Sequence, residues 1–255
     1  MVVRRKKRSI LRSIFFIFLA LCFVSVTTYY FIRFLTTPKR IEYPEFGIDI
    51  PPDYSIHGID VSRYQRVINW REVKDMKVEN IKIGFAFIKA TEGIGKIDAE
   101  FRRNWLQAEQ KKIPKGAYHF FIANKSGKAQ AKNFIEIVKL KKGDLPPVLD
   151  IEEAYGANKE VMIKGISEWL NKVEAHYGIK PIIYTNIYFY TRYLKTFDEY
   201  PVWIAHYLQP NKPRLKRKWL FWQHSERGRV NGIKSAVDFN VFAGDSSDFK
   251  ELLLK

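Results

Sequence analysis

Two kinds of apolar pattern alternate along most of the chain. From residue 57 onward, short and nearly continuous apolar runs predict strands, because strands of a parallel sheet are buried on both faces. Segments with apolar residues at every third or fourth position separate the earlier runs and predict helices. The eight predicted strands are 58–62, 85–91, 116–121, 147–152, 181–186, 202–207, 220–225 and 237–241.

Three helices are predicted between these strands. Asp98 is placed to cap the first helix, since Asp accepts hydrogen bonds from the free N–H groups of a first turn. The apolar face of this helix holds Phe101, Trp105 and Ala108. A second helix begins near Ser126. The third covers about 158–177 and carries an inward face of Met162, Ile166, Trp169, Leu170 and Val173.

The order of these elements predicts an α/β fold in which eight strands close into a barrel. The last three strands are joined by only about ten residues each, rich in Lys, Arg, Pro and Gly. Such connections are too short for regular helical crossovers between parallel strands. We therefore expect an irregular, TIM-like β/α barrel over 57–255, with its regular part at the beginning.

The N-terminal region predicts a membrane anchor. Residues 13–32 hold no charge and are long enough to span a bilayer, and the basic arm 1–12 should stay in the cytoplasm. A cleaved signal peptide is the alternative, but no small-x-small cleavage motif closes the stretch. Residues 33–56, interrupted by prolines, are expected to form a stem. The only cysteine is Cys22, so the exported domain has no disulfide.

Charge and composition limit the classes of binding partner that the chain is expected to have. Residues 1–41 carry nine Lys/Arg and no acid, and the remaining chain holds 35 basic against 27 acidic residues. A basic domain suits a polyanion such as a cell-wall polymer or nucleic acid. No helix-turn-helix, zinc-finger or RNA-binding signature is present, so we expect no nucleic acid. Screened surface charge accounts for most of the lysines.

The run 145–152 (LPPVLDIE) contains the most informative acidic pair. Asp150 and Glu152 lie two residues apart at the end of a predicted strand, so their side chains should face the same way. Barrel enzymes keep their chemistry at this end of the strands. Two adjacent carboxyls push their pKa values apart, which leaves one ionised and one protonated. This pairing is typical of glycosidic bond cleavage, although an acidic strand-to-loop boundary in water would have the same pattern.

Polar and aromatic residues follow most of the other predicted strands as well. Aromatic rings stack on the apolar faces of sugars while neighbouring polar groups bind the hydroxyls, so this pattern favours a sugar-binding cleft. The segments concerned are 58–62 (GIDVS), 89–93 (KATEG), 117–121 (AYHFF), 184–186 (YTN), 203–207 (WIAHY), 222–224 (WQH) and 237–240 (VDFN).

Together these segments resemble the family-25 glycoside hydrolases, the N-acetylmuramidases (lysozymes) that cut peptidoglycan. The resemblance covers residues 57 to about 243. It implies an irregular barrel of about five βα units followed by three strands. It also implies a peptidoglycan hydrolase. Together with the predicted single-pass anchor, this places the expected activity outside a bacterial cytoplasmic membrane. We expect a monomer without a cofactor.

The resemblance also assigns roles to residues at the strand ends. It implies that Glu152 is the general acid and that Asp150 orients or stabilises the substrate's N-acetyl group. Asp60 and Asp238 match two further acidic positions in the cleft. The residues expected to bind sugar are Tyr118, Tyr184, Trp203 and Gln223. The chain departs from the family at Asn69, where Asp is frequent, and at Arg63, where smaller or neutral residues are common.

Other interpretations remain open from the sequence. Asp60 and Asp238 could be structural, and Trp203 and Trp222 could simply fill the barrel. Glu92, in a loop-like Thr-Glu-Gly segment, could equally be an N-cap or turn residue or a ligand. A metal site is not expected, because the five histidines, His119 and His206 among them, include no i,i+3 or i,i+4 pair. A chitinase-like hydrolase and an inert glycan-binding barrel are the alternative functions.

Overall fold

The computed structural model describes the backbone of residues 2–36 and 41–255, and the side chains of 14–33 and 41–255. The chain divides into two units, residues 1–39 and 40–255. The side chains of the predicted basic arm, and residues 37–40 of the predicted stem, lie outside the described residues. The two units are considered separately below.

The first unit is one long helix, α1 (Val2–Thr36). Its stretch Ile14–Arg33 has a mean hydropathy of 2.1 and is 0% buried. At 1.5 Å per residue, such a stretch is about as long as the hydrocarbon core of a bilayer is thick. By length and composition the helix could therefore span a membrane. It is longer than the predicted 13–32, since it also covers the basic arm and the first residues of the predicted stem.

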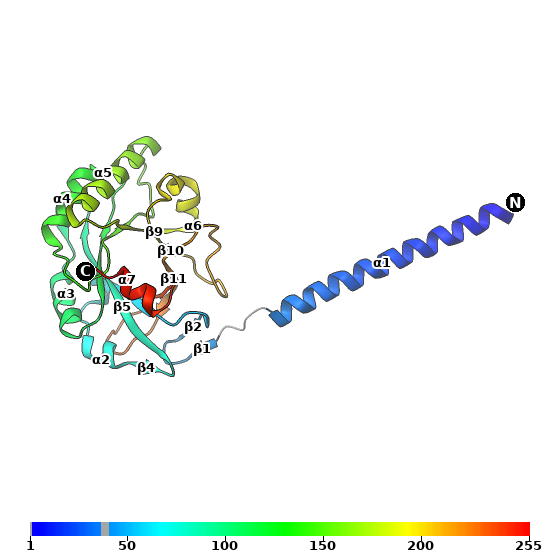
Figure 1. The fold of residues 1–255 in the computed structure, drawn as a ribbon, viewed down its shortest axis with the longest axis horizontal. Coiled ribbons are helices and arrows are strands. Elements are labelled where there is room, and N and C mark those ends of the chain that lie inside the picture. Colours follow the sequence, from blue (N-terminus) through cyan, green and yellow to red (C-terminus); the bar gives the residue numbers. More distant parts are fainter. Residues whose placement is uncertain (1, 37–40) are drawn as a thin grey trace. The chain divides into compact units, whose positions relative to one another are not determined.

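The second unit is built around a closed barrel of eight strands, and all eight strands predicted from the apolar runs are present (Figure 1). Neighbouring strands follow the chain order, and the last strand pairs with the first. All neighbours are parallel except the last strand, which is antiparallel to both of its neighbours. The strands are β3 (His57–Val61), β5 (Ile81–Glu92), β7 (Lys115–Phe120), β8 (Val148–Asp150), β9 (Ile182–Asn186), β10 (Val202–Ala205), β11 (Phe221–Gly228) and β12 (Val237–Phe242).

Helices follow the first five barrel strands and are absent between the last three, within the described residues. Asn69, Ser126 and Asn158 accept capping hydrogen bonds at the starts of α2, α4 and α5. The structure corrects the predicted cap of α3: its N-cap is Glu100, without a side-chain capping bond, and Asp98 accepts from the N–H of Glu100 just before the helix. The predicted helices are thus confirmed. The helices are α2 (Trp70–Asp75), α3 (Phe101–Gln110), α4 (Gly127–Ile137), α5 (Lys159–Tyr177), α6 (Ile187–Phe189) and α7 (Ser246–Leu252).

Shorter elements complete the second unit. Two-residue strands β4 (Lys77–Val78) and β6 (Lys96–Ile97) pair with the two ends of β5. A 3₁₀ turn, Arg63–Gln65, follows β3. Two irregular helical turns, Tyr190–Leu194 and Lys195–Phe197, follow α6.

Aromatic side chains fill the barrel at the end where its parallel strands begin. Phe85 packs against Phe221 with ring centroids 4.9 Å apart, and Phe221 against Phe242 at 5.3 Å. Phe249 of α7 closes this end, 5.7 Å from Phe85. A side chain at Gly58 would place its Cβ 2.5 Å from the Phe85 ring, so the glycine makes room for the aromatic layer. The interior at this end is therefore solid core.

The structure corrects the predicted stem for residues 41–56, which are part of the barrel unit. Strands β1 (Ile41–Tyr43) and β2 (Ile48–Ile50) form an antiparallel hairpin. Phe46 in its turn is fully buried, 5.2 Å from the Phe239 ring, and its carbonyl accepts from the Arg229 N–H. Each strand is only three residues long, so neither shows an apolar period.

Candidate active site

A cavity of about 560 Å³ opens at the carboxyl ends of the parallel strands. Alternate residues of a strand face the same side, and inward residues near this end of the first seven barrel strands line the cavity. Asp238 joins from the beginning of β12, which is antiparallel and so starts at this end. All eight residues predicted for the site line the cavity: Asp60, Tyr118, Asp150, Glu152, Tyr184, Trp203, Gln223 and Asp238.

Asp60 is the centre of a hydrogen-bond network on the cavity floor. Its Oδ2 accepts from Gln223 Nε2 at 2.9 Å and from Asn240 Nδ2 at 2.7 Å. Gln223 Oε1 in turn accepts from the hydroxyls of Tyr184 and Tyr207, at 2.8 and 2.6 Å. These bonds hold the Gln223 amide in one orientation and fix four cavity-lining side chains relative to one another.

The carboxyl groups of Asp60 and Asp238 share a hydrogen bond. Burial, and after it the negative charge of Asp60, together raise the pKa of Asp238 to about 9. Burial also raises the pKa of Asp60, to about 6, although hydrogen bonds from Asn240, Gln223 and Asp238 favour its ionised form. Asp238 therefore keeps the proton of this pair near neutral pH and donates it to Asp60.

Asp150 and Glu152, called the acidic pair below, both line the cavity but differ in setting. Strand β8 ends at Asp150, so Glu152 lies in the following loop and not on the strand as predicted. Burial raises the pKa of Asp150, and the neighbouring Glu152 raises it further. The Asp150 Oδ1 atom is buried and accepts no hydrogen bond from the described residues.

Glu152 has the electrostatic setting of a general acid. Burial, and after it the negative charges of Asp60 and Glu153, together raise its pKa to about 7. A carboxyl with a pKa near 7 still holds a large share of its protons at neutral pH and can donate one to a leaving group.

A lysine that sequence reasoning did not single out faces the acidic pair. Lys89 of β5 lines the cavity, and its charge lowers the pKa values of both carboxyls in the pair. Its Nζ pairs with Glu92 at 2.8 Å and lies 4.4 Å from the centre of the Phe120 ring. The second Glu92 oxygen pairs with Lys96 at 2.6 Å. Glu92, for which the sequence left open a cap or turn role and a ligand role, thus positions Lys89.

Aromatic side chains form the cavity wall. The Trp203 ring stacks on Phe87 with centroids 4.5 Å apart, contacts Tyr184 at 4.4 Å, and donates its N–H to Asn240. Trp203 thus both fills the barrel and lines the cavity. Tyr64, which the sequence did not indicate, lines the rim and is 71% exposed. An exposed ring at a cleft rim is a platform on which a sugar can stack.

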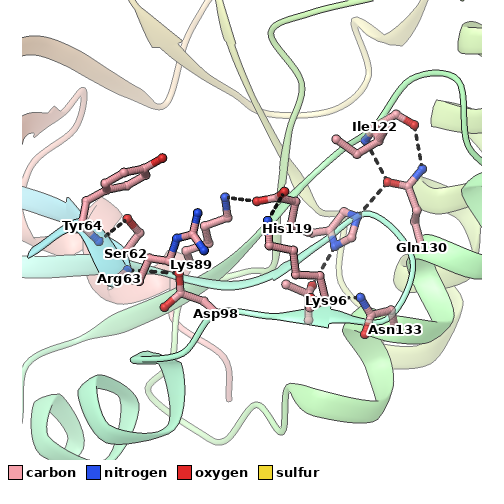
Figure 2. Close-up of polar contacts among 12 residues, drawn as sticks. Ser62, Arg63, Tyr64, Lys89, Lys96, Asp98, His119, Ile122, Gln130 and Asn133 are labelled. Atoms are coloured by element: carbon pink, nitrogen blue, oxygen red, sulfur yellow. Dashed lines mark hydrogen bonds and ion pairs between the residues drawn. The ribbon is translucent and has the colours of Figure 1, made fainter. Parts of the chain in front are cut away.

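Several other residues discussed from the sequence lie away from the cavity. His119 faces outward from β7, where its ring nitrogens hydrogen-bond Thr91 and Gln130 (Figure 2). His206 Nδ1 accepts from the Arg214 N–H. No cluster of three metal-ligating side chains occurs among the described residues.

Two further residues have structural roles. Trp222 is fully buried outside the barrel, where it packs on Tyr54 and Trp219. The N–H of Arg63 donates to Asp98, which ties the loop after β3 to the loop before α3.

The cavity combines carboxyls of raised pKa, two cations (Lys89 and Arg227) and an aromatic wall at the functional end of a barrel. This combination defines a glycoside-cleaving enzyme, because it offers a proton donor, anions for a positively charged transition state and stacking surfaces for sugar rings.

Comparison with known proteins agrees with this class. The sequence model of Glycosyl hydrolases family 25 matches residues 59–233, so the chain belongs to this family. The protein YegX of Escherichia coli strain CFT073 is 46% identical over 200 residues, covering 78% of this chain and 74% of YegX. Lysozyme M1 of Streptomyces globisporus is 35% identical over 218 residues, covering 77% and 71%.

A solved structure supports the same conclusion. A family 25 glycosyl hydrolase from Bacillus anthracis superposes with a TM-score of 0.73 at 36% identity, covering 80% of this chain and 96% of that chain. The predicted enzyme class, a glycoside hydrolase of the lysozyme type, is confirmed by the family membership.

Proposed function

We propose that the chain is a membrane-anchored lysozyme that cleaves the β-1,4 bond between N-acetylmuramic acid and N-acetylglucosamine in peptidoglycan. The observation that carries this proposal is the convergence of four buried or half-buried carboxyls on one cavity with an aromatic wall. Family membership and the lysozymes among its relatives support the substrate.

Glu152 acts as the general acid in this proposal. With its pKa raised to about 7, it donates a proton to the glycosidic oxygen as the bond to the anomeric carbon breaks. Positive charge then develops on the sugar ring, and the ionised carboxylates of the cavity stabilise it. Water attacks the anomeric carbon and gives a proton to the Glu152 carboxylate, which completes the hydrolysis and restores the acid.

Asp150 binds the acetamido group of the sugar whose bond is cleaved. Its Oδ1 lacks a hydrogen-bond donor among the described residues, and an acetamido N–H would supply one. Such a bond favours the ionised form of Asp150, which in turn orients the acetamido oxygen towards the anomeric carbon.

The remaining residues hold the sugar in position. Asp60 and Asp238 keep the floor network ordered and place one negative charge beneath the ring. Tyr118, Tyr184, Trp203 and Gln223 supply the wall against which the ring packs.

Digestion of purified peptidoglycan tests the proposal. The new reducing ends should be muramic acid, identified after borohydride reduction by mass spectrometry. Glucosamine ends would instead indicate the alternative, chitinase-like cleavage. Binding without any release of fragments would indicate an inert glycan-binding barrel.

The anchor is a separate part of the proposal. Residues 13–32 of α1 would span the membrane once, with the arm 1–12 in the cytoplasm and the barrel, from residue 41, outside. Every large apolar side chain described in this span is exposed, as suits a lipid-facing helix. The full chain should fractionate with membranes, and removal of residues 1–40 should leave a soluble, active monomer. A full-length chain found only in the soluble fraction would contradict the anchor.

A further inference from the structure

A second cavity of about 230 Å³ lies beside the cleft, between the β1–β2 hairpin and the loop that follows β10. We call it the side pocket. Arg227, on β11, lines both the cleft and the side pocket, so the two cavities adjoin at this residue. A substituent on a sugar bound in the cleft could therefore enter the side pocket.

The chemistry of the side pocket differs from that of the cleft. Its walls include no Phe, Tyr or Trp ring among the described residues, whereas Tyr64, Tyr207 and other such rings line the cleft. The side pocket instead carries charges of both signs. Arg227 and Glu42 are both exposed, and neither side chain forms an ion pair within residues 41–255. This composition suits a zwitterionic chain better than another sugar ring.

We propose that the side pocket binds the peptide stem that muramic acid carries on its lactyl group. This inference rests on the proposed function. Such stems present free carboxylates and, where they contain a diamino acid, a free amine. Arg227 can bind a carboxylate through two parallel N–H groups, and Glu42 can bind the amine. The enzyme therefore prefers glycan strands that still carry their peptides.

The hairpin that forms one wall of the side pocket lies outside the stretch that the family model matches. The family match begins at residue 59, and the hairpin lies before it, at Ile41–Ile50. Burial of Phe46 and the bond from Arg229 Nη2 to the Pro44 carbonyl hold the hairpin on the barrel. The pocket wall is thus rigidly placed before any substrate binds.

The test compares two substrates with the full chain in detergent micelles. One is purified glycan strands with their peptide stems, and the other is the same strands after an amidase has removed the stems. The readout is the ratio of kcat/KM for the two substrates. The ratio should be about ten for the unmodified enzyme, the factor expected from one charge-assisted hydrogen bond.

Two variants and one control test whether the side pocket causes the preference for strands that carry their peptides. Arg227→Gln should reduce the ratio about tenfold, and Glu42→Gln should reduce it less, about threefold. Arg214→Gln removes the same charge from the loop after β10, outside both cavities, and should leave the ratio unchanged. All three side chains are exposed, so the variants should fold, which circular dichroism checks.

Three results would overturn the inference. A ratio near one for the active, unmodified enzyme would do so and leave the proposed function intact. An unchanged ratio in Arg227→Gln would equally separate the side pocket from peptide recognition. If the enzyme cleaved neither substrate, the proposed function and this inference would both fail.

Discussion

The two ends of the barrel interior are built from the same strands but differ in chemistry. At the closed end, inward positions hold Phe85, Phe221 and Phe242, whose rings pack against one another. At the open end, inward positions on the same or neighbouring strands hold Asp60, Gln223 and Asp150, and Glu152 follows in the loop after β8.

The difference shows how one barrel divides stability from chemistry. Aromatic packing at the closed end stabilises the fold because it buries apolar surface, and an unpaired polar group there would be destabilising. The rigid strands that result hold carboxyls at the open end in a partly desolvated setting, which raises their pKa values. The account therefore predicts that substitutions at the two ends affect different properties.

The largest effect is expected at the open end. Glu152→Gln keeps the size of the side chain but removes the proton that Glu152 donates, so kcat should fall by about 10²–10⁴-fold while the melting temperature changes little. Steady-state hydrolysis of peptidoglycan and thermal unfolding measure the two properties. Glu153→Gln, at the exposed neighbouring position, is the matched control and should keep kcat within about twofold at acidic pH. Normal turnover in Glu152→Gln would transfer the acid role to Asp60 or Asp238.

At the closed end, Phe221→Ala should lower stability but leave activity largely unchanged. It removes a fully buried ring between Phe85 and Phe242, and such a cavity typically costs about 3–5 kcal/mol of unfolding free energy. Activity below the new melting temperature should persist, because no cleft residue is altered. Tyr188→Ala, at a side chain that is 68% exposed, should change stability by less than about 0.5 kcal/mol. Urea unfolding measures both variants, and equal stability losses would contradict the account.

A smaller effect sharpens the electrostatic part of the comparison. Glu152 must be protonated to act, so activity should be lost as pH rises through its pKa of about 7. The negative charge of Asp60 is one cause of that raised value. Asp60→Asn should therefore lower the pKa of Glu152 and move the alkaline limb of the kcat profile to lower pH. Asp75→Asn, on the exposed face of α2, is the control and should leave the limb in place.

Much of this organisation could be predicted from the sequence, because the patterns that specify it are local. Each barrel strand is an apolar run, and each site residue follows such a run at a spacing that places it inward. The alternation of inward and outward positions along a strand also distinguishes Trp222 from Trp203. Gln223 faces the cavity, so Trp222 beside it must face outward, whereas Trp203 is inward.

Features that depend on contacts between distant segments could not be predicted in the same way. The β1–β2 hairpin is recognisable only because Phe46 packs on Phe239, nearly two hundred residues later. Likewise, the charge of Asp60 acts on Glu152 only once the barrel closes. Lys89 lies within a motif that the sequence indicated, but its role follows from its place opposite the acidic pair.

The central claim is that the open end of the barrel holds a proton on Glu152 for catalysis. Its most direct test is a carbon-13 NMR titration of the Glu152 side-chain carboxyl, assigned by its loss in Glu152→Gln. The account predicts a pKa of about 7 that coincides with the alkaline limb of kcat/KM, which reports the free enzyme. A carboxyl that titrates near its ordinary value of 4.5, apart from that limb, would contradict it.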